Sequence, residues 1–349
     1  MKLSKQENFI KQGYLWKTDQ SVFLKQPTGI TNLTVEKFFP LSQHEIQNVS
    51  YDSKHIYIFS ARQIRVLDHL LETIEILETN IKNMYSVQML DSTNSCVIYA
   101  ENGDIVNQHI MLGGITIKTL CNTFGRVLSI DYRVSFDKNV LSEPTYFRIS
   151  DLLDEYTYWD YHIQDRLKVV TPFTIWSNQL FFQVHDFEVR ESEMRFISLD
   201  LKTGEELMNV ELKTLYHQFD SETGILYGLR GENWSYKEKE LEVIDLNTGT
   251  IETKEVISKE SFYGINPKNT TLAGNSLYFV DSRKDYGEIT ISYPRFGCID
   301  LKTNSVIYAY EPTETMGADF AKPIVNEGKI YLRSSADKFF IFEEDNSFE

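Results

Sequence analysis

The sequence predicts an all-β fold, a β-propeller of seven or eight four-stranded blades. Three observations support this fold. A strand–turn–strand pattern recurs along the chain. Its copies are about 45 residues apart, which is the length of a four-stranded blade. A second short β-rich run precedes most copies and alternates inward and outward side chains.

The turn of the pattern is clearest in three copies, which read Asp200-Leu-Lys-Thr-Gly204, Asp245-Leu-Asn-Thr-Gly249 and Asp300-Leu-Lys-Thr-Asn304. An Asp side chain accepts hydrogen bonds from backbone amides across such a turn, and Gly or Asn tolerates the positive φ that closes it. Weaker copies place five further anchors, at Lys25, Asp68, Leu112, Asp151 and Glu343.

The eight anchors predict one domain over residues 1–349. The first and last copies are incomplete, so the blade count stays at seven or eight. A propeller closes its ring to hide its edge strands. We therefore expect the N-terminal and C-terminal segments to pair.

Residues 65–80 have a competing interpretation. Leu67, Leu70, Leu71, Ile74 and Leu77 fall at the spacing of an amphipathic helix. The repeat period favours strands in this segment.

The Asp-Leu-Lys-Thr-Gly copies resemble the PQQ-like, quinoprotein-type β-propeller repeats, and the fold class is accordingly PQQ/WD40-like. This resemblance implies a fold rather than an activity. Enzymatic members of the family are expected to carry a vicinal Cys pair and a Trp in each blade. Here no Cys neighbours another, and the four Trp residues do not recur at the blade period. The resemblance is therefore to the non-enzymatic branch, and we expect no cofactor.

Composition excludes several classes of protein. The chain of 349 residues carries 51 acidic against 35 basic residues, a net charge of −16, which argues against a nucleic-acid partner. No apolar run approaches the roughly 18–20 residues of a membrane span, and the N-terminus lacks a secretory h-region. Cys96, Cys121 and Cys298 are isolated, as free thiols in a reducing compartment would be. We expect a cytoplasmic protein without a membrane partner.

No motif for catalysis or metal binding stands out. The seven histidines form none of the H-x-H, H-x-x-x-H or H-E-x-x-H spacings that place two ligands on one face. We expect these histidines in solvent or in turns. The aromatic run from Tyr156 to Tyr161 alternates as an outer strand would. The sequence thus predicts no catalytic residue and no metal site.

The feature that points to function is loop length. Between the second and third strands of a blade, four middle copies have longer loops, at approximately 137–144, 185–193, 231–239 and 281–294. Equivalent loops of a propeller emerge on one face, where binding residues concentrate. These loops hold eleven acidic residues, Asp281 among them, against six basic ones. The candidate partner-binding residues are Asp186, Phe187, Glu188, Glu191, Glu193, Glu232, Trp234, Tyr236, Asp285 and Tyr286.

Acidic residues attract a basic partner, and Trp and Tyr are frequent binding hot spots. The sequence therefore favours a non-catalytic module that binds a basic protein, with an immunity or inhibitor protein against a bacterial toxin as a specific version. Two alternatives stay open. One is a hydrolase or lyase with a site in the central channel, and the other is a scaffold of a larger assembly.

Overall fold

The computed structural model describes most of the chain. The described residues are 2–8, 14–60, 63–90, 95–102, 105–112, 115–120, 125–136, 146–164, 166–186, 193–230, 240–258, 265–284, 292–310, 320–334 and 338–343. They divide into two compact units. Unit 1 comprises Met1–Lys11, Val169–Asp200 and Glu205–Glu349, and unit 2 comprises Gln12–Lys168 and Leu201–Gly204.

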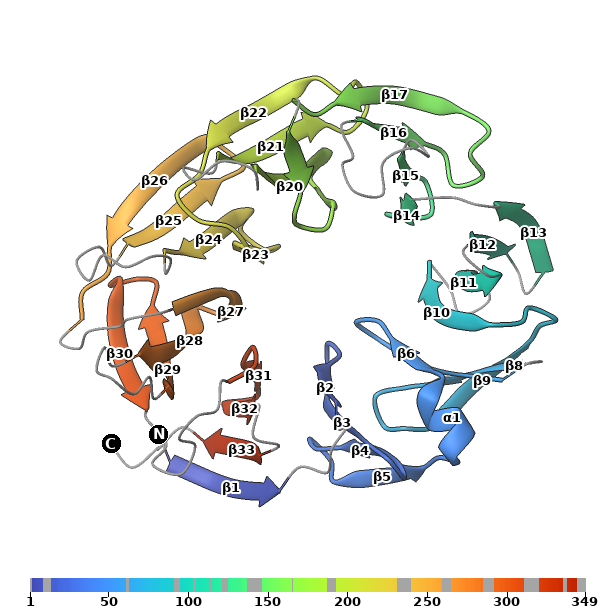
Figure 1. Ribbon diagram of the computed structural model, residues 1–349, viewed down its shortest axis with the longest axis horizontal. Coiled ribbons are helices and arrows are strands. Elements are labelled where there is room, and N and C mark those ends of the chain that lie inside the picture. Colours follow the sequence, from blue (N-terminus) through green and yellow to red (C-terminus); the bar gives the residue numbers. More distant parts are fainter. Residues whose placement is uncertain are drawn as a thin grey trace. The chain divides into compact units, whose positions relative to one another are not determined.

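Unit 2 contains four consecutive antiparallel sheets, in which each strand pairs with the next one along the chain. We call the sheets blades and number them in chain order (Figure 1). Blade 1 is β2 (Tyr14–Lys17), β3 (Val22–Gln26), β4 (Gly29–Asn32) and β5 (Lys37–Pro40). Blade 2 is β6 (Val49–Tyr51), β7 (Ile56–Phe59), β8 (Gln63–Leu67) and β9 (Thr73–Glu78). Blade 3 is β10 (Met84–Met89), β11 (Cys96–Asn102), β12 (Ile105–Leu112) and β13 (Ile115–Leu120). Blade 4 is β14 (Gly125–Val127), β15 (Arg133–Phe136), β16 (Tyr146–Ser150) and β17 (Thr157–His162).

Unit 1 contains four further sheets, apart from the first two residues of β18. Blade 5 has five strands, β18 (Leu167–Val169), β19 (Thr174–Trp176), β20 (Gln179–Asp186), β21 (Met194–Asp200) and β22 (Glu206–Glu211). Blade 6 is β23 (Gln218–Asp220), β24 (Ile225–Leu229), β25 (Glu240–Asp245) and β26 (Thr250–Glu255). Blade 7 is β27 (Ile265–Ala273), β28 (Ser276–Lys284), β29 (Ser292–Asp300) and β30 (Ser305–Tyr310). Blade 8 is β31 (Ile324–Asn326), β32 (Lys329–Arg333), β33 (Lys338–Glu343) and β1 (Lys2–Asn8).

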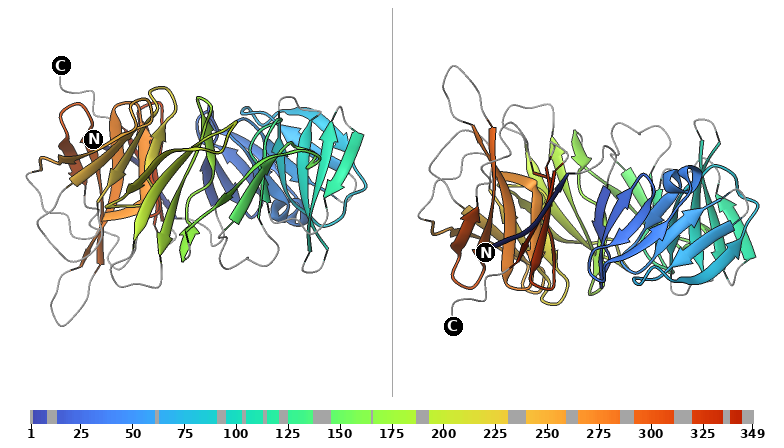
Figure 2. Two further views of the ribbon diagram at one scale, coloured as in Figure 1. Left: turned by 90° about the horizontal axis from the view of Figure 1, so that it is seen from above. Right: turned by 90° about the horizontal axis from the view of Figure 1, so that it is seen from below.

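This succession of eight sheets is an eight-bladed β-propeller, which confirms the predicted fold class and settles the blade count. The outer strand of blade 8 comes from the other end of the chain. β1 pairs antiparallel with β33, from Lys2 opposite Glu343 to Asn8 opposite Lys338. Figures 1 and 2 show β1 beside the red strands of blade 8. A single domain over residues 1–349 stays a prediction.

The repeated turns have the chemistry that the sequence predicts. Asp245 Oδ1 accepts a hydrogen bond from the Asn247 amide at 2.8 Å, and Gly249 closes the turn with a φ of 68°. Asp300 Oδ1 accepts from the Lys302 amide at 3.0 Å in the same way. In each case the turn joins the third strand of a blade to the fourth. Residues 65–80 also follow this pattern, as β8, a turn and β9, so the helical interpretation was wrong.

The first anchor was assigned to the wrong strand. Lys25 lies in β3, the second strand of blade 1, whereas the equivalent third strand is β4 and ends at Asn32. Asn32 Oδ1 accepts from the Thr34 amide at 2.8 Å, so an asparagine takes the part that Asp has elsewhere. Glu36, with a φ of 55°, stands where the clearest copies have Gly or Asn.

The core lies between neighbouring blades of each unit. In unit 1, Phe181 and Phe196 of blade 5 pack in one cluster with Leu226 and Ile244 of blade 6. A second cluster joins blades 7 and 8 through aromatic side chains, Phe296, Phe320, Phe340 and Phe342. In unit 2, one such cluster contains Cys96, which is buried as expected, as is Cys298 in unit 1. Cys121 lies outside the described residues.

The one helix among the described residues, α1 (Gln43–Gln47), links blades 1 and 2. Ser42 and Glu45 form a capping box at its start, and Ile46 is buried.

Candidate functional site

The hairpins between the second and third strands differ in length from blade to blade. Two residues separate these strands in blades 1 and 3, three in blade 2 and four in blade 8. Nine residues separate them in blade 4, seven in blade 5, ten in blade 6 and seven in blade 7. The four longer hairpins are those that the sequence analysis singled out. We call the inserted segments 137–145, 187–193, 230–239 and 285–291 the long hairpins.

Two of the ten predicted partner-binding residues lie in the described part of the chain, both at the base of the blade 5 hairpin. The Asp186 amide donates to the Glu193 carbonyl at 2.9 Å, which closes the hairpin. Asp186 is only 6% exposed. The Glu193 side chain is 39% exposed and accepts from Arg195 Nη1 at 2.9 Å.

The other eight predicted residues lie outside the described residues. They are Phe187, Glu188, Glu191, Glu232, Trp234, Tyr236, Asp285 and Tyr286.

An ion pair supports the base of the blade 6 hairpin. The Arg230 amide donates to the Glu240 carbonyl at 3.0 Å, and Arg230 Nη1 donates to Glu240 Oε2 at 2.9 Å. Lys213 Nζ lies 3.5 Å from the same carboxylate oxygen. The hydrogen bond from Arg230, assisted by Lys213, lowers the pKa of Glu240. Part of the charge near this hairpin is therefore already paired.

A buried ion pair lies close to the start of the blade 7 hairpin. Asp281 on β28 and Arg295 on β29 are 0% and 6% exposed, and Arg295 Nε donates to Asp281 Oδ2 at 3.0 Å. Sequence reasoning counted Asp281 among the acidic residues of the loop face. The structure corrects this, because the carboxylate is enclosed in the blade and its charge is compensated there.

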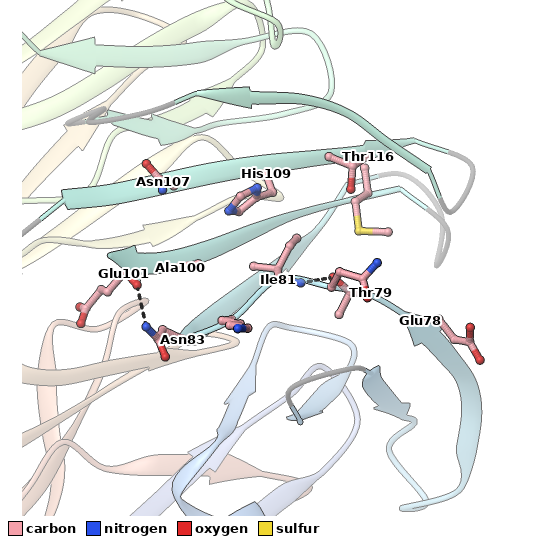
Figure 3. Close-up of a pocket in the computed structure, with 12 residues that line it drawn as sticks. Glu78, Thr79, Ile81, Asn83, Ala100, Glu101, Asn107, His109 and Thr116 are labelled. Carbon is pink, nitrogen blue, oxygen red and sulfur yellow. Dashed lines mark hydrogen bonds between the residues drawn. The ribbon is translucent and has the colours of Figure 1, made fainter. Parts of the chain in front are cut away.

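Unit 2 contains a cavity of about 530 Å³ beside the outer strands of blade 3. Figure 3 shows Asn107 and His109 of β12 across this cavity from Thr79 and Ile81. His109 Nδ1 lies 3.0 Å from Thr119 Oγ1, and burial lowers the pKa of His109, which favours the neutral ring. Polar side chains line it together with Ile81, Ala100 and Met111, and among the described residues the lining offers neither an activated nucleophile nor a paired acid and base.

Unit 1 contains a smaller cavity, of about 270 Å³, lined by residues of blades 5, 6 and 7 and by Lys322, which precedes blade 8. We call it the Tyr216 cavity. Its apolar side chains include Phe181, Phe219 and Leu226, and its two cationic side chains are Lys268 and Lys322. Sequence reasoning missed this cavity because its residues are spread along the chain from Thr171 to Lys322 and share no motif.

A buried polar network lies beside the Tyr216 cavity. Gln183 Oε1 accepts from the Tyr216 amide at 2.7 Å, which leaves Gln183 Nε2 to donate to His217 Nδ1 at 2.6 Å. The His217 ring is therefore neutral with its proton on Nε2, which lies 3.9 Å from Glu242 Oε1. Burial lowers the pKa of His217 to about 3 and raises that of Glu242 to about 7.

The burial of His217 corrects the expectation that all seven histidines lie in solvent or in turns. Its side chain is 0% exposed. Gly228 makes the room for it, because a Cβ at that position would lie 2.4 Å from His217 Nε2.

Within the described ranges, no group of three or more His, Cys, Asp or Glu side chains is arranged to hold a metal ion. No helix in the same ranges is long and apolar enough to cross a membrane.

Comparison with known proteins defines the fold class. No family model and no curated protein sequence matches the chain. BamB from Moraxella catarrhalis is similar over 100% of this chain and 99% of that chain, at 9% identity and a TM-score of 0.57. The dihydro-heme d1 dehydrogenase NirN, solved in complex with DHE, is similar over 86% of this chain and 66% of that chain, at 9% identity and a TM-score of 0.50.

At these identities the likeness shows the fold alone. The chain is an eight-bladed β-propeller, similar in fold to the PQQ-like propeller of BamB.

Proposed function

We propose that this β-propeller is a non-catalytic binding protein that holds a basic protein partner through its long hairpins. The observation that carries the proposal is their length. Blades 4 to 7 insert seven to ten residues where the other blades insert two to four. Two residues suffice to join antiparallel strands, and binding residues are concentrated in longer loops.

The composition of the long hairpins supports a basic partner. They contain nine acidic against five basic residues, within a chain of net charge −16. Acidic surfaces raise the rate at which a basic protein associates. Phe187, Trp234, Tyr236 and Tyr286 add the side chains that most often anchor an interface.

The described bases of these hairpins support the same function. Hydrogen bonds and ion pairs fix the strand ends from which two of the hairpins leave, through Asp186 and Glu193 in blade 5 and through Arg230 and Glu240 in blade 6. In blade 7 the Asp281–Arg295 pair joins the two strands three residues inside the hairpin. A rigid base reduces the ordering cost of binding. Our specific version is an immunity or inhibitor protein that blocks a basic toxin in the cytoplasm, without nucleic acid or membrane as a partner.

Charge reversal within one long hairpin tests the proposal. The variant carries Glu188→Lys and Glu191→Lys, and the matched control carries Glu252→Lys and Glu255→Lys on the exposed outer strand β26. Both change the net charge by the same amount. Each tagged protein is used to capture partners from native lysate at low salt, and association rates of the captured protein are then measured against ionic strength.

We expect wild type and control to capture the same basic protein, released by salt, and the hairpin variant to associate at least tenfold more slowly. Equal association rates for the hairpin variant and the control would contradict the acidic hairpin site. Capture of no basic protein by wild type would contradict the function itself and favour the enzyme or scaffold alternatives.

A further inference from the structure

We propose that the Tyr216 cavity is a binding site for a small amphipathic anion, in which a carboxylate or phosphate group is attached to a compact apolar body. This site lies among the described residues of unit 1, and the proposal does not depend on the long hairpins. Its ligand chemistry follows from two lysines, a rigid polar frame and an apolar lining.

The two lysines bring uncompensated positive charge to the cavity. Lys268 Nζ lies 4.7 Å from the centroid of the Tyr216 ring, and Lys322 Nζ donates to Gln218 Oε1 at 3.0 Å. An aromatic face and a neutral amide hold these ammonium groups without neutralising them. In the described part of this acidic chain, neither lysine forms an ion pair with a carboxylate. Each ammonium has three N–H donors, so donors remain for an anion.

The residues that hold the lysines are themselves fixed. Tyr216 has a φ of 61°, a left-handed conformation that is strained in a non-glycine residue. Two amide side chains maintain it. Gln183 accepts from the Tyr216 amide at 2.7 Å, and Gln218 Nε2 donates to the Tyr216 carbonyl at 3.1 Å. Strained backbone that is held in this way is concentrated at ligand sites.

Tyr216 also links the two lysines. Its ring contacts Lys268, and its carbonyl contacts Gln218, whose other amide atom contacts Lys322. The two positive charges are thus positioned by one connected set of side chains rather than by chance proximity.

Apart from Thr171 and Thr174, the remaining lining is apolar, and the cavity limits the size of the ligand. Pro172, Phe181, Phe196, Phe219 and Leu226 line the cavity. Its volume of about 270 Å³ lies near the lower limit of roughly 300 Å³ for small-molecule sites, which favours a ligand with a single ring or a short chain. No carboxylate lines the cavity among the described residues, so nothing there repels an anion.

The experiment measures the binding of three probes by titration calorimetry at low salt. Benzoate and phenyl phosphate supply the two anionic groups on an aromatic ring, and benzyl alcohol is the uncharged control. The site variant carries Lys268→Gln and Lys322→Gln. The matched control carries Lys254→Gln and Lys329→Gln, two exposed lysines of unit 1 that pair with Glu252 and Glu343. Thermal melting checks that each variant is folded, and the single substitutions replace any double variant that is not.

We expect at least one anionic probe to bind wild type and the matched control equally, and the site variant at least tenfold more weakly. Benzyl alcohol should bind at least tenfold more weakly than that anion. Preference for benzoate or for phenyl phosphate identifies the anionic group, and both results support the site. Absence of binding by both anions, equal binding by the site variant, or equal binding of benzyl alcohol would overturn the proposal.

Discussion

Asp281 and Arg295 face each other across the ladder between β28 and β29 as a buried ion pair. Three residues follow Asp281 in β28, and three precede Arg295 in β29. The register that brings them together also fixes where the long hairpin of this blade begins. The pair therefore connects the stability of the blade with the placement of a candidate binding segment.

Breaking this pair should destabilise the protein strongly. Asp281→Asn leaves the Arg295 guanidinium buried without its counter-charge, and loss of one partner of a buried pair costs about 3–5 kcal/mol. We expect a loss of this size in the free energy of unfolding, measured by denaturant titration. Glu252→Gln, which breaks the exposed pair with Lys254, is the control and should change stability by less than about 1 kcal/mol. Equal effects of the two substitutions would show that burial of Asp281 does not govern its contribution.

Alanine substitutions at two glycines with positive φ should show how much stability is lost to backbone strain and how much to a steric clash. Gly224 has a φ of 75°, and a Cβ there would lie 2.1 Å from Trp176 Cη2, whereas Gly274 has a φ of 55° and open space around it. Gly274→Ala should cost only the strain of the left-handed conformation, roughly 1–2 kcal/mol. Gly224→Ala adds displacement of the Trp176 ring, a further ~1–3 kcal/mol. Thermal melting of both variants checks the order, and equal losses would contradict it.

Local patterns were sufficient to predict the blades. The turns after Asp200, Asp245 and Asp300 depend on residues within five positions of one another, so the sequence alone revealed them. The same repeat spacing identified which four hairpins are long, although it placed the blade 7 loop at 281–294 and the structure has 285–291 between the strands. The turn after Asn32 was not predicted, because it has Asn in place of Asp and Glu36 in place of Gly. Its hydrogen bond from the Thr34 amide to the Asn32 side chain is nevertheless equivalent to those of the other turns.

The sites that were missed depend on distant contacts. Burial of His217 requires the space left by Gly228 on β24. The Asp281–Arg295 pair requires the exact strand register of blade 7, and the Tyr216 cavity brings Lys268 and Lys322 to the same aromatic residue. The repeat period of the sequence does not predict contacts between side chains that are distant along the chain.

The His217–Glu242 pair should give opposing pH dependences. Burial raises the pKa of Glu242 from 4.5 to about 7, so the folded state binds more protons than the unfolded state between these values. The contribution of Glu242 to the free energy of unfolding is therefore present in full below pH 4.5. It is lost as the pH rises to 7, by on the order of 3 kcal/mol. Burial lowers the pKa of His217 from 6.5 to about 3, so its contribution rises with pH over that range.

Single substitutions should separate these two contributions. The stability of Glu242→Gln relative to wild type should increase from pH 4.5 to 7, because the variant has no carboxyl to ionise. The stability of His217→Gln relative to wild type should decrease as the pH rises towards 6.5. Denaturant unfolding at pH values from 4 to 8 measures both differences. Parallel pH profiles for wild type and both variants would mean that neither group has a shifted pKa.

Asn32→Asp should destabilise the protein even though it restores the Asp of the repeat. Asn32 is 0% exposed, and its amide nitrogen donates to the His69 carbonyl and, at 3.2 Å, to Ser21 Oγ. A carboxylate keeps the acceptor for the Thr34 amide but cannot donate to His69, which leaves a partly buried carbonyl unpaired at a cost of about 1–3 kcal/mol. Asp300→Asn makes the reverse exchange in an exposed turn, where the amide oxygen can accept from the Lys302 amide and the amide nitrogen can donate to Thr303 Oγ1, so it should change stability less than Asn32→Asp does. Denaturant titration measures the free energy of unfolding of both variants. A neutral or stabilising Asn32→Asp would mean that the turn needs only an acceptor, and that the contact with His69 contributes nothing to the packing of blade 1 against blade 2.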